Sequence, residues 1–169
     1  MKYELITNRT RLRRLNQNDF INLRQLEADA DVVRYTRIQT PRTEQETQAR
    51  LNDQLQRDDG PAPFGIWAVE LKDTHQFIGW FMLVPKPERS AELGYMIVKT
   101  FWGQGFATEV SRCLVEAGFH SLNLASVQAV TDDGNPSSTK ILVKIGFTLL
   151  RHDDDTKLNY FELKNKNFR

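Results

Sequence analysis

A short glycine-rich segment, Gly103-Gln104-Gly105, is the part of the sequence whose residue types and spacing point most directly to chemistry. It follows a run of strand-forming residues and leads into a helical pattern that begins at Phe106. Glycines let a backbone approach a phosphate closely, and the free N–H groups and dipole of a helix N-terminus favour negative charge. The sequence therefore predicts a phosphate-binding loop, although a tight strand-to-helix turn without a ligand would use the same residues.

Two common phosphate-binding motifs do not fit this loop. A nucleoside-triphosphate P-loop requires lysine and then serine or threonine after its last glycine, and neither follows Gly105 in the required place. A dinucleotide-binding fingerprint requires a third glycine where this chain has Thr108, and no matching acidic residue follows until Asp132. The P-loop is therefore excluded and the dinucleotide site is a weak match, which leaves another phosphate-bearing ligand or a turn without a ligand.

Composition narrows the possible partners and the compartment. The chain has 169 residues, 40% of them hydrophobic, and 23 basic against 22 acidic side chains. A net charge of +1 without a basic stripe argues against a nucleic-acid partner. The apolar stretches are too short to cross a bilayer, and the first residues lack the apolar core of a secretion signal, so we expect no membrane partner and a cytoplasmic location.

The cysteine and histidine content gives no sign of a metal site. Cys113 is the only cysteine, and His75, His120 and His152 show no metal-ligand spacing. Cys113 is either a nucleophilic thiol or a small buried residue, and its place on a helical face with Val110 favours burial. We expect no metal.

The elements that must position the loop alternate between strand and helix patterns. Thr43 with Glu46 forms a capping box before one helix, Asn135-Pro136 begins another that Gly146 ends, and Asn18-Asp19 is expected to cap the first. Strands are predicted at 11–15, 64–71, 76–84, 91–98, 126–131, 147–151 and 158–163. The order β-α-α-β-β-β-α-β-α-β-β predicts a mixed α/β fold with one central sheet, in a single domain over 1–169.

Several of these segments resemble one family of acyltransferases. Residues 92–97 and 101–109 resemble the strand and helix that flank the pyrophosphate loop in the RimJ/RimL branch of GNAT N-acetyltransferases, which modifies ribosomal-protein N-termini. Asn135-x-x-Ser138, Lys144-x-Gly-Phe147 and the first strand at 10–15 are similar to further motifs of the branch. One departure is Thr100, which stands where the phosphate motif often has glutamine or arginine. The resemblance implies the GNAT fold and acetyl-CoA as co-substrate.

The resemblance also implies which residues hold acetyl-CoA. The pantetheine arm is expected beside the strand at Ile97 and Val98, and Asn135 is expected to reach the same arm. The pyrophosphate is expected among the N–H groups of Gly103, Gln104, Gly105, Phe106, Ala107 and Thr108. A helix also needs a cap at Asn135, so capping is an equally good explanation for that residue.

Transfer of an acetyl group to an amine requires a proton acceptor for the amine and a proton donor for the departing thiolate. By resemblance, Glu92 is the candidate base, acting through water, and Ser138 the candidate acid. A main-chain N–H near Ile97 is expected to stabilise the oxyanion. A structural carboxylate and an ordinary first-turn hydroxyl are the alternative explanations for Glu92 and Ser138.

The amine acceptor is the least defined part of the prediction. The resemblance favours a protein or peptide N-terminus, held by the first two helices, the loop at 30–41 and the loop at 152–157. Asp29, Asp31 and the acidic run at 153–155 could instead attract a small cationic amine, such as a polyamine or aminoglycoside, and an amino acid is a further option. A CoA-binding regulatory module without turnover is the alternative from another class. The chain is expected to be a monomer or homodimer.

Overall fold

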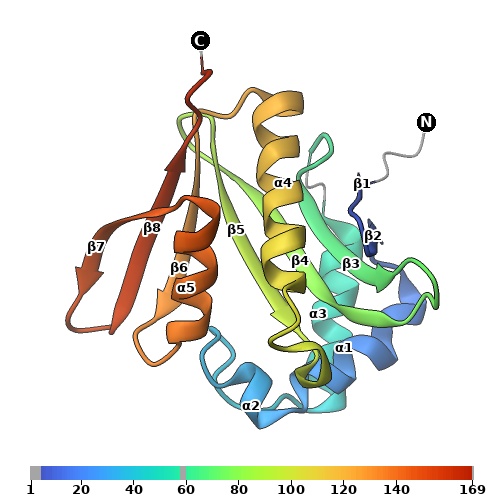
Figure 1. Cartoon of the computed structure of the whole chain (residues 1–169). Helices are drawn as coiled ribbons and strands as arrows, with labels where there is room; N and C mark the ends of the chain where they lie inside the picture. The colour runs from blue at the N-terminus through green and yellow to red at the C-terminus, as the bar shows by residue number, and fades with distance from the viewer. Residues whose placement is uncertain (1–4, 58–59, 169) are drawn as a thin grey trace.

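The computed structural model describes residues 5–57 and 60–168, which form an eight-stranded sheet with helices on both faces (Figure 1). The strand order is β1-β2-β3-β4-β5-β6-β8-β7, and every neighbouring pair is antiparallel except β5 and β6. The strands are β1 (Leu5–Ile6), β2 (Thr10–Arg14), β3 (Gly65–Leu71), β4 (Phe77–Lys86), β5 (Ser90–Ile97), β6 (Ser126–Asp132), β7 (Thr148–Asp153) and β8 (Leu158–Lys164).

Two layers of helices enclose the sheet. Helices α4 (Phe106–Leu122) and α5 (Pro136–Ile145) cover one face, and α1 (Phe20–Glu27) and α3 (Glu44–Gln56) cover the other (Figure 1). The short α2 (Ala30–Val33) lies at the bottom of the view, and single 3₁₀ turns precede α1 and follow β5. No helix in the described part of the chain is long and apolar enough to span a bilayer.

Alternation along the strands divides the hydrophobic core into two clusters. On β5, Leu93 and Ile97 pack with α4 residues such as Val110, whereas Met96 packs with α1 residues such as Leu23. Successive side chains of a strand point to opposite faces, so each strand supplies both clusters. The sheet thus separates an α4/α5 side from an α1–α3 side.

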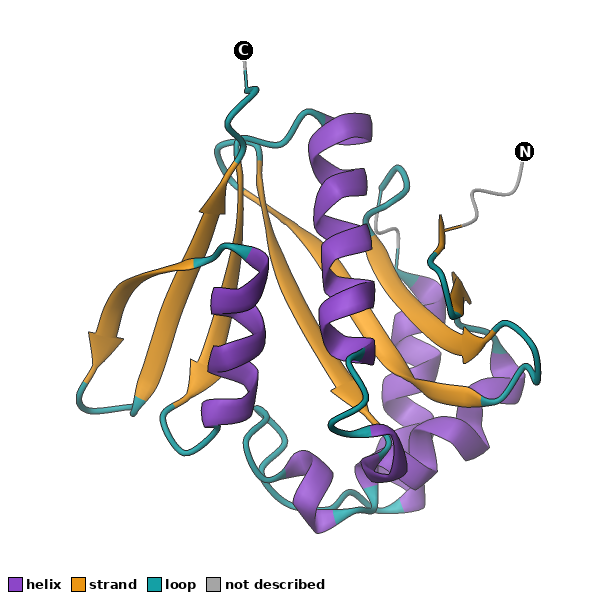
Figure 2. Ribbon diagram, in the orientation of Figure 1, coloured by secondary structure: helices purple, strands orange, loops and turns teal. Residues whose placement is uncertain are grey.

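The central strands β5 and β6 pair for only three residues. Their parallel ladder runs from Ser90 with Ser126 to Glu92 with Gln128, and β5 continues to Ile97 without β6. Figure 2 shows the two strands diverging toward their C-terminal ends. Beyond Glu92 the two strands are therefore not paired with each other, and the interval between them is called the gap below.

The fold agrees with the mixed α/β prediction, and the capping predictions are confirmed at two of three helices. The Thr43–Glu46 capping box and the Asn135 cap with Gly146 at the end are present. At α1 the prediction is wrong, because Asn16 caps the preceding 3₁₀ turn and the Asp19 side chain makes no cap bond to the helix. Strand β1 and helix α2 were not predicted. The sequence also predicts that Asp59-Gly60-Pro61 ends the helix that follows Thr43, and Asp59 lies outside the described residues.

Candidate active site

The exposed edge of β5 directs main-chain groups into the gap. The N–H of Val98 donates to the Ile78 carbonyl over 2.9 Å, so the even-numbered residues of β5 bond to β4. Backbone groups of consecutive strand residues point in opposite directions, so those of Leu93, Tyr95 and Ile97 face the gap. The Ile97 carbonyl accepts a bond from the Trp102 indole at 2.7 Å. An extended ligand can pair with the remaining groups as an added strand.

The main-chain groups of Ile97 and Val98, the two residues predicted to bind the pantetheine arm, point in different directions. The Ile97 N–H faces the gap, whereas Val98 uses its N–H for Ile78 and its carbonyl for the Phe101 N–H, at 2.9 Å. Val98 therefore lies beside the predicted site with both main-chain groups bonded inside the protein.

The predicted phosphate loop has the backbone shape that glycine permits. Gly103 and Gly105 have φ angles of +73° and +83°, in the region that side chains other than glycine rarely adopt. The Gln104 side chain donates to the Thr100 carbonyl over 2.8 Å and closes the loop. The segment is therefore a rigid turn that delivers the chain to the first residue of α4.

The start of α4 presents main-chain donors. Gly105 is the N-cap and has no side chain to cap with, and the first helical bond runs from the Glu109 N–H to the Gly105 carbonyl at 3.1 Å. The first-turn N–H groups of Phe106, Ala107 and Thr108 have no acceptor within a helix. Such an N-terminus binds anions, because its donors and the helix dipole both favour negative charge.

The α4/α5 side of the gap contains a pair of hydroxyl groups. Ser138 in α5 lies 3.0 Å, oxygen to oxygen, from Tyr95 in β5. Burial raises the pKa of Tyr95 above its usual value of about 10, and the Ser138 hydrogen bond opposes this only in part. The Tyr95 hydroxyl is consequently protonated at neutral pH and available as a donor. Ser138 is a candidate from the sequence, whereas its partner Tyr95 was not named there. The signal available for Tyr95 was its place two residues before Ile97, on the same face of the predicted strand.

Asn135 acts as a helix cap. Its Oδ1 accepts a bond from the Ser138 N–H at 3.1 Å, which is the cap geometry predicted from the sequence. The cap fixes the first turn of α5, and with it the position of the Ser138 hydroxyl.

Glu92 lies on the opposite face of the sheet from this hydroxyl pair. Its neighbours Ala91 and Leu93 pack in the α4/α5 cluster, so the Glu92 side chain points to the α1–α3 side. There its carboxylate, 12% exposed, accepts from Lys86 at 2.8 Å and from Arg37 at 3.1 Å. The structure therefore places the candidate base and acid on the two sides of the gap, and it surrounds the base with two cations that the sequence did not reveal.

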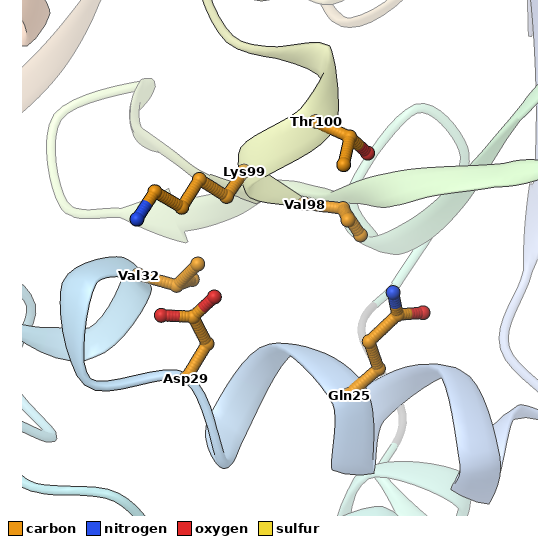
Figure 3. A pocket seen from close by; sticks show the side chains of 6 residues that line it. All are labelled: Gln25, Asp29, Val32, Val98, Lys99 and Thr100. Atoms are coloured by element: carbon orange, nitrogen blue, oxygen red, sulfur yellow. The ribbon is translucent and has the colours of Figure 1, made fainter.

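Two hollows lie on the α1–α3 side. The first, of about 330 Å³, opens between the first helices and the end of β5 (Figure 3). It is lined by Gln25, Asp29, Val32, Val98, Lys99 and Thr100. The second, of about 620 Å³, is lined by residues between 37 and 53, including Arg37, which also contacts Glu92. The second hollow is called the groove below.

The acidic residues considered as a site for a cationic amine are engaged within the protein. Asp31 pairs with Lys99, and Asp29 accepts from the Asp31 N–H at 2.9 Å. Asp153 accepts main-chain bonds from Asp155 and Thr156, both at 3.1 Å. These contacts are typical of turns and surface ion pairs, so they give little support to a polycation site.

The cysteine and histidine residues form no cluster with chemistry of their own. Cys113 is half-buried against the α4/α5 cluster, and burial raises the pKa of its thiol, as expected of a packing residue. Within residues 5–57 and 60–168, no group of three or more histidine, cysteine, aspartate or glutamate side chains is arranged to hold a metal ion.

Comparison with a profile of a protein family shows to which family this chain belongs. The profile described as an acetyltransferase (GNAT) domain matches residues 9–148. The chain belongs to the GNAT family of acetyltransferases. It is therefore an acyltransferase, and GNAT enzymes transfer an acetyl group from acetyl-CoA to an amine.

Individual relatives agree with membership of the GNAT family. The uncharacterized N-acetyltransferase p20 of Bacillus licheniformis is 34% identical over 148 residues, which cover 85% of this chain and 81% of that protein. A GNAT acetyltransferase from Bacillus anthracis superposes with a TM-score of 0.84 at 18% identity, covering 96% of this chain and 98% of the other. The Vibrio cholerae spermidine N-acetyltransferase, solved with CoA and spermine, gives 0.80 at 18% identity over 95% of this chain and 98% of its own. Those two structures establish the shared fold.

Proposed function

We propose that this GNAT acetyltransferase passes the acetyl group of acetyl-CoA directly to the α-amine of a peptide or protein N-terminus, as its resemblance to the RimJ/RimL branch implies. The observation that carries the proposal is the open, polar groove that reaches Glu92 through Arg37. A groove open to solvent can admit the end of a polypeptide while the rest of the chain stays outside.

Acetyl-CoA binds, in this proposal, along the edge of β5 and around the start of α4. The Ile97 N–H faces the gap and suits an amide of the pantetheine arm, beside Val98. Main-chain donors of 103–108 suit the pyrophosphate, and Asn135 contributes by fixing the start of α5. Recognition through the main chain explains why few charged side chains are needed at this end of the site.

The reaction requires a donor and an acceptor of protons on either side of the thioester carbonyl. The neutral amine attacks that carbonyl, a C–N bond forms, and the C–S bond breaks. Glu92, through water, takes the proton released by the amine, and the Ser138–Tyr95 hydroxyl pair supplies one to the thiolate. Their placement on opposite faces of the gap lets the two proton transfers proceed without competing for one site.

Charge around the groove supports a peptide over a polyamine. The groove is lined by Arg37, Arg42 and Arg50 against Glu46 and Asp53, and Lys86 also contacts Glu92. A ligand with several ammonium groups would meet repulsion here, whereas a single α-amine on a peptide brings little charge. The likeness to spermidine N-acetyltransferase concerns the fold, at 18% identity, and does not transfer that acceptor to this chain.

A thiol-release assay with acetyl-CoA tests the proposal. The panel comprises peptides with a free α-amine, the same peptides with that amine formylated but a lysine retained, and spermidine. Release of CoA only with the free α-amine, and mass spectra placing the acetyl group on the first residue, are the expected results. Turnover with spermidine alone would show that the acceptor is a polyamine and not a peptide. CoA binding without turnover of any amine would favour a CoA-binding regulatory module over an enzyme.

A further inference from the structure

Arg9 connects the segment before β2 to the phosphate loop. Its Nη1 donates to the main-chain carbonyl of Gln104 over 2.9 Å, and its Nε donates to the Glu109 carboxylate over 2.7 Å. The guanidinium also lies 4.1 Å from the centre of the Phe106 ring. One side chain from the start of the chain thus contacts the loop, the first helical residue and the first turn of α4.

The contact with Gln104 fixes a particular peptide plane. A peptide unit is planar and trans, so its C=O and N–H point in opposite directions. The carbonyl of Gln104 and the N–H of Gly105 belong to one such unit. With the carbonyl held by Arg9, the Gly105 N–H points away from the Arg9 guanidinium. Gly105 has no side chain and a φ of +83°, so nothing else in the residue sets this orientation.

Arg9 also offsets the negative charge of Glu109. Its carboxylate lies in the first turn of α4, close to the donors that the diphosphate would use. Its Oε1 accepts bonds from the Thr7 hydroxyl at 2.6 Å and from the Arg9 N–H at 2.8 Å. An unneutralised carboxylate there would repel a diphosphate, whereas the bond to the Arg9 guanidinium offsets its charge.

We propose that Arg9 is a positioning residue for the diphosphate of the acetyl donor: it orients the Gly105 N–H and neutralises Glu109. Arg9 acts through the loop and does not take part in the chemical step. The proposal rests on the proposed binding of acetyl-CoA, and it adds a residue outside the glycine loop to the recognition of the diphosphate.

The role of Arg9 is tested with two compounds, CoA, which carries the diphosphate, and S-acetylpantetheine, which lacks it. Arg9→Gln should weaken CoA binding about tenfold by calorimetry, because it removes two charge-assisted bonds. With S-acetylpantetheine, which ends before the diphosphate, kcat/KM should stay within about twofold of the parent value. Arg89→Gln, at the β4–β5 turn over Phe168, is the matched control and should bind CoA as the parent does.

A second substitution separates positioning from a merely structural role. Adding Glu109→Gln to Arg9→Gln should recover part of the lost affinity, because it removes the carboxylate that Arg9 no longer neutralises. Arg9→Lys keeps the charge but not the forked donors, so it should weaken binding less, and it serves if Arg9→Gln does not fold. The proposal would be overturned if both Arg9 variants bound CoA as tightly as the parent does. It would also be overturned if Arg9→Gln lowered kcat/KM with S-acetylpantetheine by the same factor as it weakened CoA binding. A parent chain that binds no CoA would refute the proposed function itself.

Discussion

The hydroxyl oxygens of Tyr95 and Ser138 lie 3.0 Å apart, although the residues are separated by 43 positions in the chain. The contact bridges β5 and α5 where β5 and β6 have diverged. Tyr95 also stacks on Phe81, with ring centres 5.1 Å apart, which fixes the orientation of its hydroxyl. The pair is therefore held in place beside the gap, as the proposed proton donor must be.

Tyr95→Phe should lower kcat by about 100-fold and leave the Kd for CoA unchanged, because loss of a general acid slows the step without removing a binding contact. Ser138→Ala should cost less than tenfold, since Tyr95 keeps its proton. Steady-state kinetics and calorimetry on both variants make the comparison. If kcat fell further in Ser138→Ala than in Tyr95→Phe, Ser138 and not Tyr95 would be the general acid.

Glu92→Gln should lower kcat by about 100-fold at neutral pH with little change in CoA affinity, because the amide cannot accept the proton of the amine. Arg37→Gln is the companion variant: it removes one cation from Glu92 and retains the carboxylate. We expect it to remain active. Equal turnover in Glu92→Gln and the parent would leave Glu92 with the structural role of binding Lys86 and Arg37.

Replacing both Gly103 and Gly105 by valine should raise the Kd for CoA by about 100-fold or more. At φ angles of +73° and +83° a β-branched residue is strained, so the loop would change shape and lose its aligned N–H groups. Calorimetry with CoA measures the loss, and circular dichroism checks that the sheet is intact. Unchanged affinity in a folded variant would remove the loop from the binding site.

Glu27→Gln should lower the free energy of unfolding by about 3 kcal/mol. The Glu27 side chain is fully buried and accepts from Arg50 at 2.6 Å and from Thr47 at 2.9 Å, so the change leaves the half-buried Arg50 guanidinium without its carboxylate partner. Urea denaturation measures the difference. Glu116→Gln, exposed on α4, is the control and should stay within about 0.5 kcal/mol of the parent; a Glu27→Gln value equally small would show that the pair is dispensable.

Asp19 should make stability depend on acid pH. Burial opposes its charge, but hydrogen bonds from Arg13, Asn16 and Asn22 outweigh burial and lower its pKa below the usual value. A lowered pKa means that this stabilisation is complete above about pH 4, where the unfolded residue is also ionised, and is lost as pH falls through the folded pKa. Asp19→Asn should be less stable than the parent at pH 7, and the difference should shrink below pH 4. A constant difference down to pH 2 would contradict this.

The sequence predicted the elements whose signals are local. Strands β3 and β4 carry runs rich in β-branched and aromatic residues, and α5 carries a cap residue, a first-turn proline and a terminal glycine. Strand β1, with two residues, and α2, with four, are too short for a periodic pattern to appear. At α1, Asn16 and Asn18 are both good cap residues, and only the backbone geometry chooses between them.

From the sequence, the candidate site can be described only where its residues follow one another in the chain. The loop at 103–105 is contiguous, so its glycines and the following helix could be read directly. The partners of Glu92 come from the loop after α2 and the end of β4, and Tyr95 meets Ser138 across two elements. Such contacts depend on strand order and on which face each side chain takes, and neither is encoded at a fixed spacing.

The division of the core by the sheet has a consequence for how such an enzyme can change. Phe106 and Val110 of α4 pack in one cluster, and Leu23 of α1 and Leu51 of α3 pack in the other. Substitutions in the helices around the groove can alter its shape while the opposite layer keeps its packing. If the groove receives the amine as proposed, a chain built this way can be retargeted to new amines, by evolution or in the laboratory, without redesigning how it acquires the acetyl group.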